Sequence, residues 1–534
     1  MSFRKLALFY WVAFYLAVTV LRSQQIGPVN EEVDISQFNH VIYVMSGQKL
    51  SLKNNADRGS RLNPFTSINE AVLFANKITK YNEKTAILVA SGNYEVSETM
   101  VLSPNIHLYG GFSDDGVWQR DIFNHPTYLI GVGDKRIIIL SESTKIDGFV
   151  ISGARFRGKG AAVYISSASA EISNNIFINN GTLSPKNWKP KYLHQQANDG
   201  GAICVENYAS PIIRNNLFVD NKTETGRGAA IAVNNYCSPQ IIGNVFIGNI
   251  SGLNDPMRSS DGAAISLFNW CSGIVANNIF ISNSAISKND GGAIFTALWC
   301  SPVINGNIFV NNKSDDDGGA IFIGGQEHRY DRPFDPIPPE DKFYVKVINN
   351  LFIYNKNITP KKNNPDGAVR FTMNVRGEFI GNIFAHNSGL QFQNSHVKLS
   401  RNIILDNLSL VQSGDEFCEF VLTDNILLEP PKLNAQGVDS SDNVAIIKDG
   451  VNFIDDSFEI KPISAKFNPN TYTTILVVDM NNRDIDLVNR VVNYNSKWSV
   501  IKKSGEDYIE LWGDFSDALY LYILPTYKYK IKTK

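Results

Sequence analysis

The chain has 534 residues, 43% hydrophobic and 19% charged, with a formal net charge of −2 at pH 7. A single globular core rarely exceeds about 250–300 residues, so this length requires several domains or one repetitive domain. The acidic balance argues against a nucleic-acid-binding protein, which is usually basic. Five cysteines in so long a chain do not indicate a disulfide framework.

The first 23 residues have the pattern of a secretory signal peptide. Arg4 and Lys5 form a basic start, an apolar run extends from Leu6 to Leu21, and Ser23 is small enough for cleavage. A membrane anchor is the alternative, for which roughly 18 or more apolar residues are wanted. No later stretch is long and apolar enough to span a membrane. We expect a secreted, periplasmic or cell-surface protein, a monomer with no transmembrane segment in the mature chain.

A five-residue sequence of the type Asp-Gly-small-Ala-Ile recurs through the middle of the chain. Weaker copies begin at Lys159 and Asp366. The clear copies begin at Asp199, Arg227 (where Arg replaces Asp), Asp261, Asp290 and Asp317. Constant segments separated by variable loops predict a solenoid in which each repeat is one structural unit.

A second sequence, Asn followed by an aliphatic residue and Phe, follows each first one and usually begins 16 or 17 residues after the first one begins. It begins at Asn175, Asn216, Asn244, Asn278, Asn307, Asn350 and Asn382. These Asn side chains are expected to stack at a turn, where their amides hydrogen-bond along the stack and the residue tolerates a left-handed φ.

The repeats consist of short β-branched and aromatic runs separated by Gly and Asn, which predicts β-strands. Apolar residues fill equivalent positions two apart, such as Ile231 with Val233 and Ile265 with Leu267. Such a period of two predicts that one face of each strand is buried. Strands repeated in register one coil apart must run parallel. We therefore predict an all-β fold, a parallel β-helix around an apolar axis.

These coils resemble the right-handed parallel β-helices of the pectin-lyase-like superfamily, as found in secreted bacterial proteins. The start of the chain carries the resemblance further through Ile42-Tyr43-Val44, Asn63-Pro64-Phe65, Tyr109-Gly110-Gly111-Phe112 and Ile146-Asp147-Gly148-Phe149. It covers roughly residues 40–430 and implies a short helix near residues 68–75 that caps the open end. The resemblance is specific for the fold and weak for the activity, because one fold hosts many functions.

The repeat pattern stops after about residue 430. We predict a β-helix over residues 35–445 and a small β module or C-terminal cap over residues 446–534. Short antiparallel strands are expected around Val491-Val492, Trp498–Ile501 and Ile509–Trp512.

Aspartates occupy one column of the predicted stack, at Asp199, Asp261, Asp290, Asp317 and Asp366. Ionised neighbours about 4.8 Å apart would repel one another, so solvent, backbone N–H groups or a cation must relieve the charge. Calcium takes six to eight oxygen ligands, and the superfamily resemblance implies calcium binding on this type of sheet. Asp261, Asp290 and Asp317 are therefore candidate calcium ligands. The alternative is that each Asp before Gly caps a turn.

Aromatic and cysteine columns follow the strands. Tyr208, Tyr236, Trp270 and Trp299 share one register, either as a sugar-binding ladder or as stacked rings that fill a corner. The next residues, Cys237, Cys271 and Cys300, are expected to form a buried thiol stack, because parallel strands hold the outer two too far apart for one zinc.

Three insertions between the repeats are rich in basic and aromatic residues, which suits an anionic sugar chain. Solvated loops are the alternative. The candidate catalytic residues are Lys191, His194, His328 and Arg329. The candidate substrate-binding residues are Trp188, Tyr192, Tyr330, Arg332 and Arg370.

Two chemistries suit these residues. A polysaccharide lyase needs a base and cations that stabilise an enolate-like charge, whereas a glycoside hydrolase needs two carboxylates. Candidate carboxylates for hydrolysis are Glu206, Asp290, Asp317, Glu327 and Asp331. We favour a carbohydrate-active protein with an anionic polysaccharide as partner, and a lyase reaction by β-elimination. A non-catalytic glycan-binding protein is the third reading.

Overall fold

The coordinates are a computed structural model. Residues 26–447 are described, except for 48–56, 185, 187–197, 257, 327–337, 340–341, 359–366 and short gaps beyond residue 385. Beyond residue 447 only isolated strands are described. The predicted signal peptide lies outside the described residues. Among these residues, no helix is both long and apolar enough to cross a bilayer.

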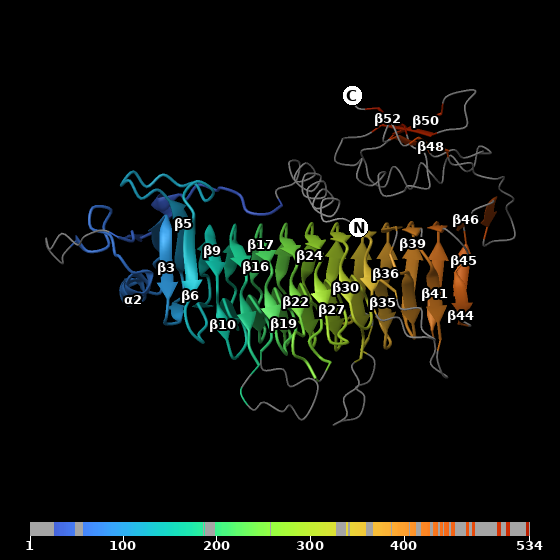
Figure 1. The fold of residues 1–534 in the computed structure, drawn as a ribbon, viewed down its shortest axis with the longest axis horizontal. Helices are drawn as coiled ribbons and strands as arrows, with labels where there is room; N and C mark the ends of the chain where they lie inside the picture. Colours follow the sequence, from blue (N-terminus) through green and yellow to red (C-terminus); the bar gives the residue numbers. More distant parts are fainter. Residues whose placement is uncertain are drawn as a thin grey trace, which may run out of the picture.

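Strands stack in coils along the long axis of the molecule (Figure 1). Each central coil contributes one strand in turn to four sheets, numbered here in the order in which the coil visits them. Sheet 1 contains β4 (Met100–Leu102), β7 (Ile138–Leu140), β11 (Val163–Ser166), β15 (Ile203–Glu206), β19 (Ile231–Asn234), β23 (Ile265–Phe268), β27 (Ile294–Ala297), β31 (Ile321–Gly324), β35 (Val369–Thr372), β38 (Leu390–Gln393), β41 (Leu408–Val411) and β44 (Lys432–Asn434).

Sheets 2 to 4 complete the coils. Sheet 2 contains β1 (His40–Val44), β2 (Thr85–Ala90), β5 (Ile106–Phe112), β8 (Lys145–Asp147), β12 (Glu171–Ser173), β16 (Ile212–Arg214), β20 (Gln240–Ile242), β24 (Ile274–Ala276), β28 (Val303–Asn305), β32 (Val345–Ile348), β36 (Arg376–Ile380), β39 (His396–Ser400), β42 (Glu419–Thr423) and β45 (Val438–Ser441). Sheet 3 contains β3 (Gly92–Val96), β6 (Thr127–Gly131), β9 (Phe149–Ser152), β13 (Ile176–Ile178), β17 (Leu217–Val219), β21 (Val245–Ile247), β25 (Ile279–Ile281), β29 (Ile308–Val310), β33 (Leu351–Ile353), β37 (Ile383–Ala385), β40 (Ile403–Ile404), β43 (Ile426–Leu427), β46 (Val444–Ile447) and β47 (Gly450–Phe453). Sheet 4 contains β10 (Arg155–Phe156), β14 (Gly181–Thr182), β18 (Lys222–Thr223), β22 (Ile250–Ser251), β26 (Ser284–Ala285), β30 (Lys313–Ser314) and β34 (Lys356–Asn357).

The predicted register is confirmed. Ile203 pairs with Ile231, Ile231 with Ile265, Ile265 with Ile294, and Ile294 with Ile321, all between parallel strands. These side chains are fully buried and belong to one continuous apolar core. The parallel β-helix therefore follows directly from repeated strands that stack in register.

One expectation about burial is wrong for the central strands of sheet 1. The period of two predicted one buried face, but all four residues of β15, β19, β23, β27 and β31 are buried. The chain covers the outer face itself. Gly200 has φ +79° and lies so close to β15 that a Cβ there would be 2.9 Å from the Cβ of Cys204. Each Asp-Gly turn thus folds back over the strand that follows it, and only glycine fits there.

The Asn residues form the expected ladder. The Asn216 Nδ2 group donates to Asn244 Oδ1 at 3.0 Å, and the Asn244 Nδ2 group donates to Asn278 Oδ1 at 3.1 Å. The left-handed φ falls one residue earlier than predicted, at Asn215 and Asn277 or at a glycine such as Gly243. A second, fully buried ladder lies five residues further on in each coil, at Asn180, Asn221, Asn249, Asn283, Asn312 and Asn355.

Phenylalanine rings stack through the core beside the first ladder. The rings of Phe177, Phe218, Phe246, Phe280 and Phe309 stack with centroids 4.7–4.9 Å apart. This spacing matches the distance between neighbouring strands. The aromatic stack and the amide ladder therefore impose the same axial distance between successive coils.

The two ends of the solenoid differ. Helix α2 (Ile68–Ile78) begins after the N-cap Ser67 and lies beside the first coils, where the resemblance implied a helix (Figure 1). Its residues Ile68, Ala71, Val72 and Ala75 are buried in the same core as the strands. At the other end, the parallel pairing stops where β46 pairs antiparallel with β47.

Little of the predicted C-terminal module falls within the described residues. Strands β48 (Lys466–Asn468) and β49 (Thr473–Ile475) pair antiparallel. Strand β50 (Ser499–Lys502) pairs antiparallel with β51 (Ile509–Trp512), which pairs parallel with β52 (Lys530–Lys532). The predicted strand at Val491-Val492 lies outside the described residues.

An N-terminal strap, defined as residues 26–34, runs along the outside of the coils before the short 3-10 helix η1 (Ile35–Gln37) and β1. The Gly27 N–H donates to the carbonyl of Gly243 at 2.7 Å, and the Val29 N–H donates to Asn174 Oδ1 at 3.1 Å. Glu31 makes a bidentate ion pair with Arg214, at 2.7 and 3.1 Å. The strap therefore ties several coils together.

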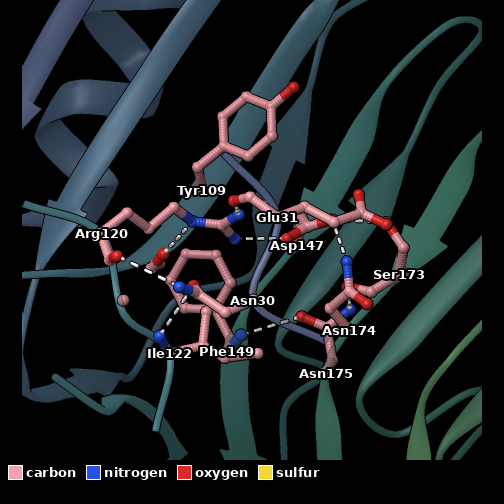
Figure 2. A network of polar contacts seen from close by, with 12 residues as sticks. Asn30, Glu31, Tyr109, Arg120, Ile122, Asp147, Phe149, Ser173, Asn174 and Asn175 are labelled. Atoms are coloured by element: carbon pink, nitrogen blue, oxygen red, sulfur yellow. Dashed lines mark hydrogen bonds and ion pairs between the residues drawn. The ribbon is translucent and has the colours of Figure 1, made fainter. Parts of the chain in front are cut away.

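The strap is anchored on a buried ion pair between Arg120 and Asp147 (Figure 2). Asp147 also accepts hydrogen bonds from Ser173 Oγ at 2.6 Å and Asn174 Nδ2 at 2.9 Å. Burial raises the pKa of Asp147, but Arg120 and Lys145 outweigh it and hold that pKa below its usual value. Because this carboxylate is well paired, the network has a structural role.

Candidate functional site

The outer face of sheet 1 carries the Asp column, and three of these aspartates, Asp199, Asp261 and Asp290, cap the backbone of the next coil. Asp261 Oδ1 accepts from the N–H of Asp290 at 3.0 Å, and Asp290 Oδ1 accepts from the N–H of Asp317 at 2.8 Å. Asp199 Oδ1 accepts from the N–H of Arg227 at 2.9 Å in the same way. The turn-capping interpretation is therefore correct as far as it goes. In each of these three bonds, the cap uses one oxygen of the carboxylate.

Arg227 neutralises the first part of the column. Its guanidinium lies 3.3 Å from Asp199 Oδ2 and 3.5 Å above the ring of Phe268. Both partners of this ion pair are buried. The negative charge of Asp199 is therefore balanced by Arg227, unlike that of the aspartates in the following coils.

The second part of the column gathers negative charge. Asp290, Asp316 and Asp317 each offer an oxygen, and these three oxygens lie within 4.8 Å of one another. Burial, together with the charges of Asp261, Asp317 and Asp316, raises the pKa of Asp290 well above its usual value. We call Asp290, Asp316 and Asp317 the acidic triad. Asp316, the neighbour of Asp317, was not among the predicted ligands, and Asp261 lies one coil away from the triad.

The triad fits a cation. Asp317 is only 9% exposed, and its Oδ1 atom is buried without a hydrogen-bond partner among the described residues. An unpaired buried carboxylate oxygen is costly. The donor set is entirely oxygen, as hard divalent cations prefer. The triad can therefore hold a metal ion, with Asp317 Oδ1 as an available ligand.

Arg370 lies at the other end of this charge cluster. The residue is 5% exposed, its Nε atom lies 3.9 Å from Asp317 Oδ2, and its Nη2 group donates to Gln393 Oε1. Within the described part of the chain, Nε and Nη1 of Arg370 have no hydrogen-bond partner. Arg370 thus places a buried positive charge beside the triad.

The comparisons with known proteins concern the fold. Residues 135–330 match the family model of the right-handed β-helix region. This stretch is a right-handed β-helix region, within the stack of parallel sheets that the structure shows. Residues 52–196 of this β-helix protein also match a family described as a protein of unknown function (DUF1565). A search of curated proteins found no match.

Two solved structures are similar to this β-helix protein. ORF18 of Geobacillus virus E2 is 13% identical over 78% of this chain and 62% of its own, with a TM-score of 0.29. The crystal structure of pectate lyase Pel9A is 12% identical over 76% of this chain and 80% of its own, with a TM-score of 0.28. The β-helix protein thus spans less than two thirds of the viral chain.

Most predicted site residues of this β-helix protein lie in its insertions. The candidate catalytic residues Lys191, His194, His328 and Arg329 lie outside the described residues, as do the candidate substrate-binding residues Trp188, Tyr192, Tyr330 and Arg332. Arg370, Asp261, Asp290 and Asp317 are described, and the structure brings Arg370 and Asp317 together.

The aromatic column is partly a ladder. The rings of Tyr208 and Tyr236 stack 5.1 Å apart, and those of Tyr236 and Trp270 stack 6.4 Å apart. Tyr208 is 71% exposed and Tyr236 is 47% exposed. Because the rings stack on one another, the faces between them are used within the ladder, and the end faces and ring edges are what a sugar could meet. Trp299 leaves the ladder and packs edge-on against Phe343 at 5.0 Å.

The cysteine column is a stack of free, buried thiols, as predicted. Cys237, Cys271 and Cys300 are fully buried, and the Cys271 N–H donates to Cys300 Sγ at 3.2 Å. Burial raises the pKa of the Cys271 thiol well above its usual value, so this group is inert.

A polar cluster near the start of sheet 1 was missed by the sequence argument. Lys159 Nζ lies 3.1 Å from Glu206 Oε1, and Arg136 lies over the ring of Tyr164 with its Cζ 4.3 Å from the centroid. Lys159 occupies the same repeat position as the aspartates, which is the signal in the sequence that could have revealed it. Arg136 lies just before β7 and Tyr164 lies in β11, and neither residue type recurs at its position in the following coils.

Proposed function

We propose that this β-helix protein is secreted, binds an anionic polysaccharide on the outer face of sheet 1, and cleaves it by β-elimination. The proposal rests on one observation, which is that Arg370 lies beside the acidic triad. Carboxylates that can hold a cation lie beside a buried guanidinium. Cations on both sides of a uronate carboxylate favour the enolate-like charge that forms in this reaction.

Calcium is the proposed cation, held by Asp290, Asp316 and Asp317. When bound, it would neutralise part of the negative charge of a uronate. In the proposed reaction a base removes the proton next to the carboxylate, a carbon–carbon double bond forms, and the glycosidic carbon–oxygen bond breaks. The leaving oxygen then takes a proton. His328, Arg329, Lys191 and His194 remain the candidate bases.

The test is incubation of the purified protein with polygalacturonate, alginate and hyaluronate, with calcium and with EDTA. The proposal expects the ultraviolet absorbance of unsaturated uronates to appear with calcium and to disappear with EDTA. His328→Ala or Arg329→Ala should reduce turnover by roughly two to four orders of magnitude if either residue is the base. If neither has an effect, Lys191 and His194 are the next bases to test.

Glycoside hydrolysis is the second candidate. It is favoured by one observation, which is that Asp290 has a raised pKa beside the carboxylate of Asp317. Glycosidases use two carboxyl groups near one another, and a raised pKa suits the one that acts as the acid. Release of reducing sugars without ultraviolet absorbance, unaffected by EDTA, would support hydrolysis over elimination. Retention of a polymer without cleavage would support a binding protein.

A further inference from the structure

Arg136 is a cation held in a fixed position near the start of sheet 1. Its guanidinium lies between two rings, 4.8 Å from the centroid of Phe156 and 4.3 Å from that of Tyr164. Its Nε group donates to the carbonyls of Gly160 at 3.0 Å and Lys159 at 3.2 Å. Two flanking rings and two carbonyls fix the plane of the guanidinium without neutralising its charge.

The charge of Arg136 is not matched by an acid. Among the described residues, no carboxylate lies within ion-pair distance of it, and the nearby Glu206 is already paired with Lys159 at 3.1 Å. Burial lowers the pKa of Arg136, because desolvation disfavours the charged form. An arginine nevertheless stays protonated in proteins. A half-buried, unmatched guanidinium is therefore a ready partner for an anion.

Arg136 and the acidic triad lie on the same sheet, several coils apart. Tyr164, on which Arg136 stacks, is in β11, and Asp290 precedes β27. The strands between them pair in the order β11, β15, β19, β23 and β27. Four steps of about 4.8 Å place the two sites roughly 19 Å apart along the axis. The exposed Tyr208 and Tyr236 belong to coils in between.

From this geometry we infer that Arg136 is a second anion-binding subsite, which holds a carboxylate or sulfate of the same polymer about four coils from the acidic triad. The inference rests on the proposed function and narrows its substrate. The ligand must be an extended polyanion long enough to reach both sites. Short oligomers would occupy one site alone.

The experiment compares wild type, Arg136→Gln and Arg136→Lys on a long uronate polymer and on its trimer. The probe is whichever of polygalacturonate, alginate and hyaluronate is retarded most by wild type in affinity electrophoresis. Arg136→Gln should weaken polymer binding about tenfold, a loss of about 1.4 kcal/mol, and leave trimer binding within twofold. Arg136→Lys should recover part of the loss, because it restores the charge without the planar fork.

The matched control is Arg157→Gln, which removes the same charge from an exposed arginine that is paired with Asp134 at 2.9 Å. Polymer binding by this variant should equal that of wild type. Binding is measured directly, so the subsite can be supported even if no cleavage occurs and the lyase proposal fails. The inference is overturned if Arg136→Gln binds the polymer like wild type, if polymer and trimer weaken equally, or if wild type binds none of the three polymers.

Discussion

Asp290 and Asp317 occupy the same position in successive coils, and Asp290 Oδ1 accepts a hydrogen bond from the N–H of Asp317 at 2.8 Å. The bond orders the turn, but it also brings the two carboxylates together with that of Asp316. A structural cap repeated along a solenoid thus creates a charge cluster. The cluster gives the molecule a site that a cation can stabilise.

Calcium should raise the thermal stability of the protein, and EDTA should lower it. A ligand at about 100 times its Kd adds roughly 2.7 kcal/mol to the folded state. Asp290→Asn and Asp317→Asn should each remove most of the calcium-dependent shift in Tm. Asp199→Asn is the matched control, because Asp199 is paired with Arg227 and should leave the shift intact. An unchanged Tm of wild type with calcium and EDTA would exclude the site.

Without calcium, stability should fall as pH rises, because of Asp290. Burial and the neighbouring carboxylates raise its folded-state pKa, so above about pH 4 the folded chain keeps a proton that the unfolded chain loses. The stability that this retained proton gives the folded chain is complete below the pKa that Asp290 has in the unfolded chain. It is lost as pH rises through the pKa that Asp290 has in the folded chain, by at most about 1.4 kcal/mol per pH unit. Urea unfolding of Asp290→Asn should show a flatter dependence on pH. Parallel curves for the two proteins would refute this assignment.

Asp147→Ala should be strongly destabilising. The change leaves Arg120 buried without its carboxylate, and breaking a buried pair in this way costs about 3–5 kcal/mol. Glu31→Gln, which breaks the more exposed pair with Arg214, should cost no more than about 1 kcal/mol. Urea denaturation of both variants measures the contrast. Equal losses would mean that the strap, rather than the buried pair, dominates stability here.

Ile294→Asp should unfold the solenoid locally. Ile294 is fully buried among the equivalent residues of neighbouring coils, and an unpaired charge there costs several kcal/mol. Hydrogen exchange should show lost protection in β27 and in its neighbours β23 and β31. Thermal stability equal to that of wild type would contradict the buried position of this column.

Asn278→Ala should be destabilising because the Asn ladder is continuous. The Asn278 amide donates to the carbonyl of Ile241 at 2.9 Å, and its oxygen accepts from the N–H of Asn244 at 2.8 Å. Each buried partner left unsatisfied costs about 1–3 kcal/mol. Asn277→Gly is the control, since glycine accepts the left-handed φ of +54° at that exposed position. Chemical denaturation should separate the two variants clearly.

The repeats determined the coil, because identical strands one repeat apart can share a core only by stacking parallel and in register. Ile265 and Ile294 could therefore be placed in the core from their position in the repeat alone. The Asn and Phe stacks followed in the same way, since a column of equal side chains meets itself in every coil. The second Asn ladder, five residues after the first, was equally legible in the sequence and was overlooked.

The tertiary structure alone decided the contacts between residues that do not repeat. Glu31 reaches Arg214 across 183 positions, and no periodic pattern predicts such a pair. The same holds for Arg136 on Tyr164 and for Asp316 beside Asp290, whose proximity depends on how each turn folds over the next strand. Repetition fixes positions along the axis, whereas charge clusters depend on side-chain directions that only the folded coils define.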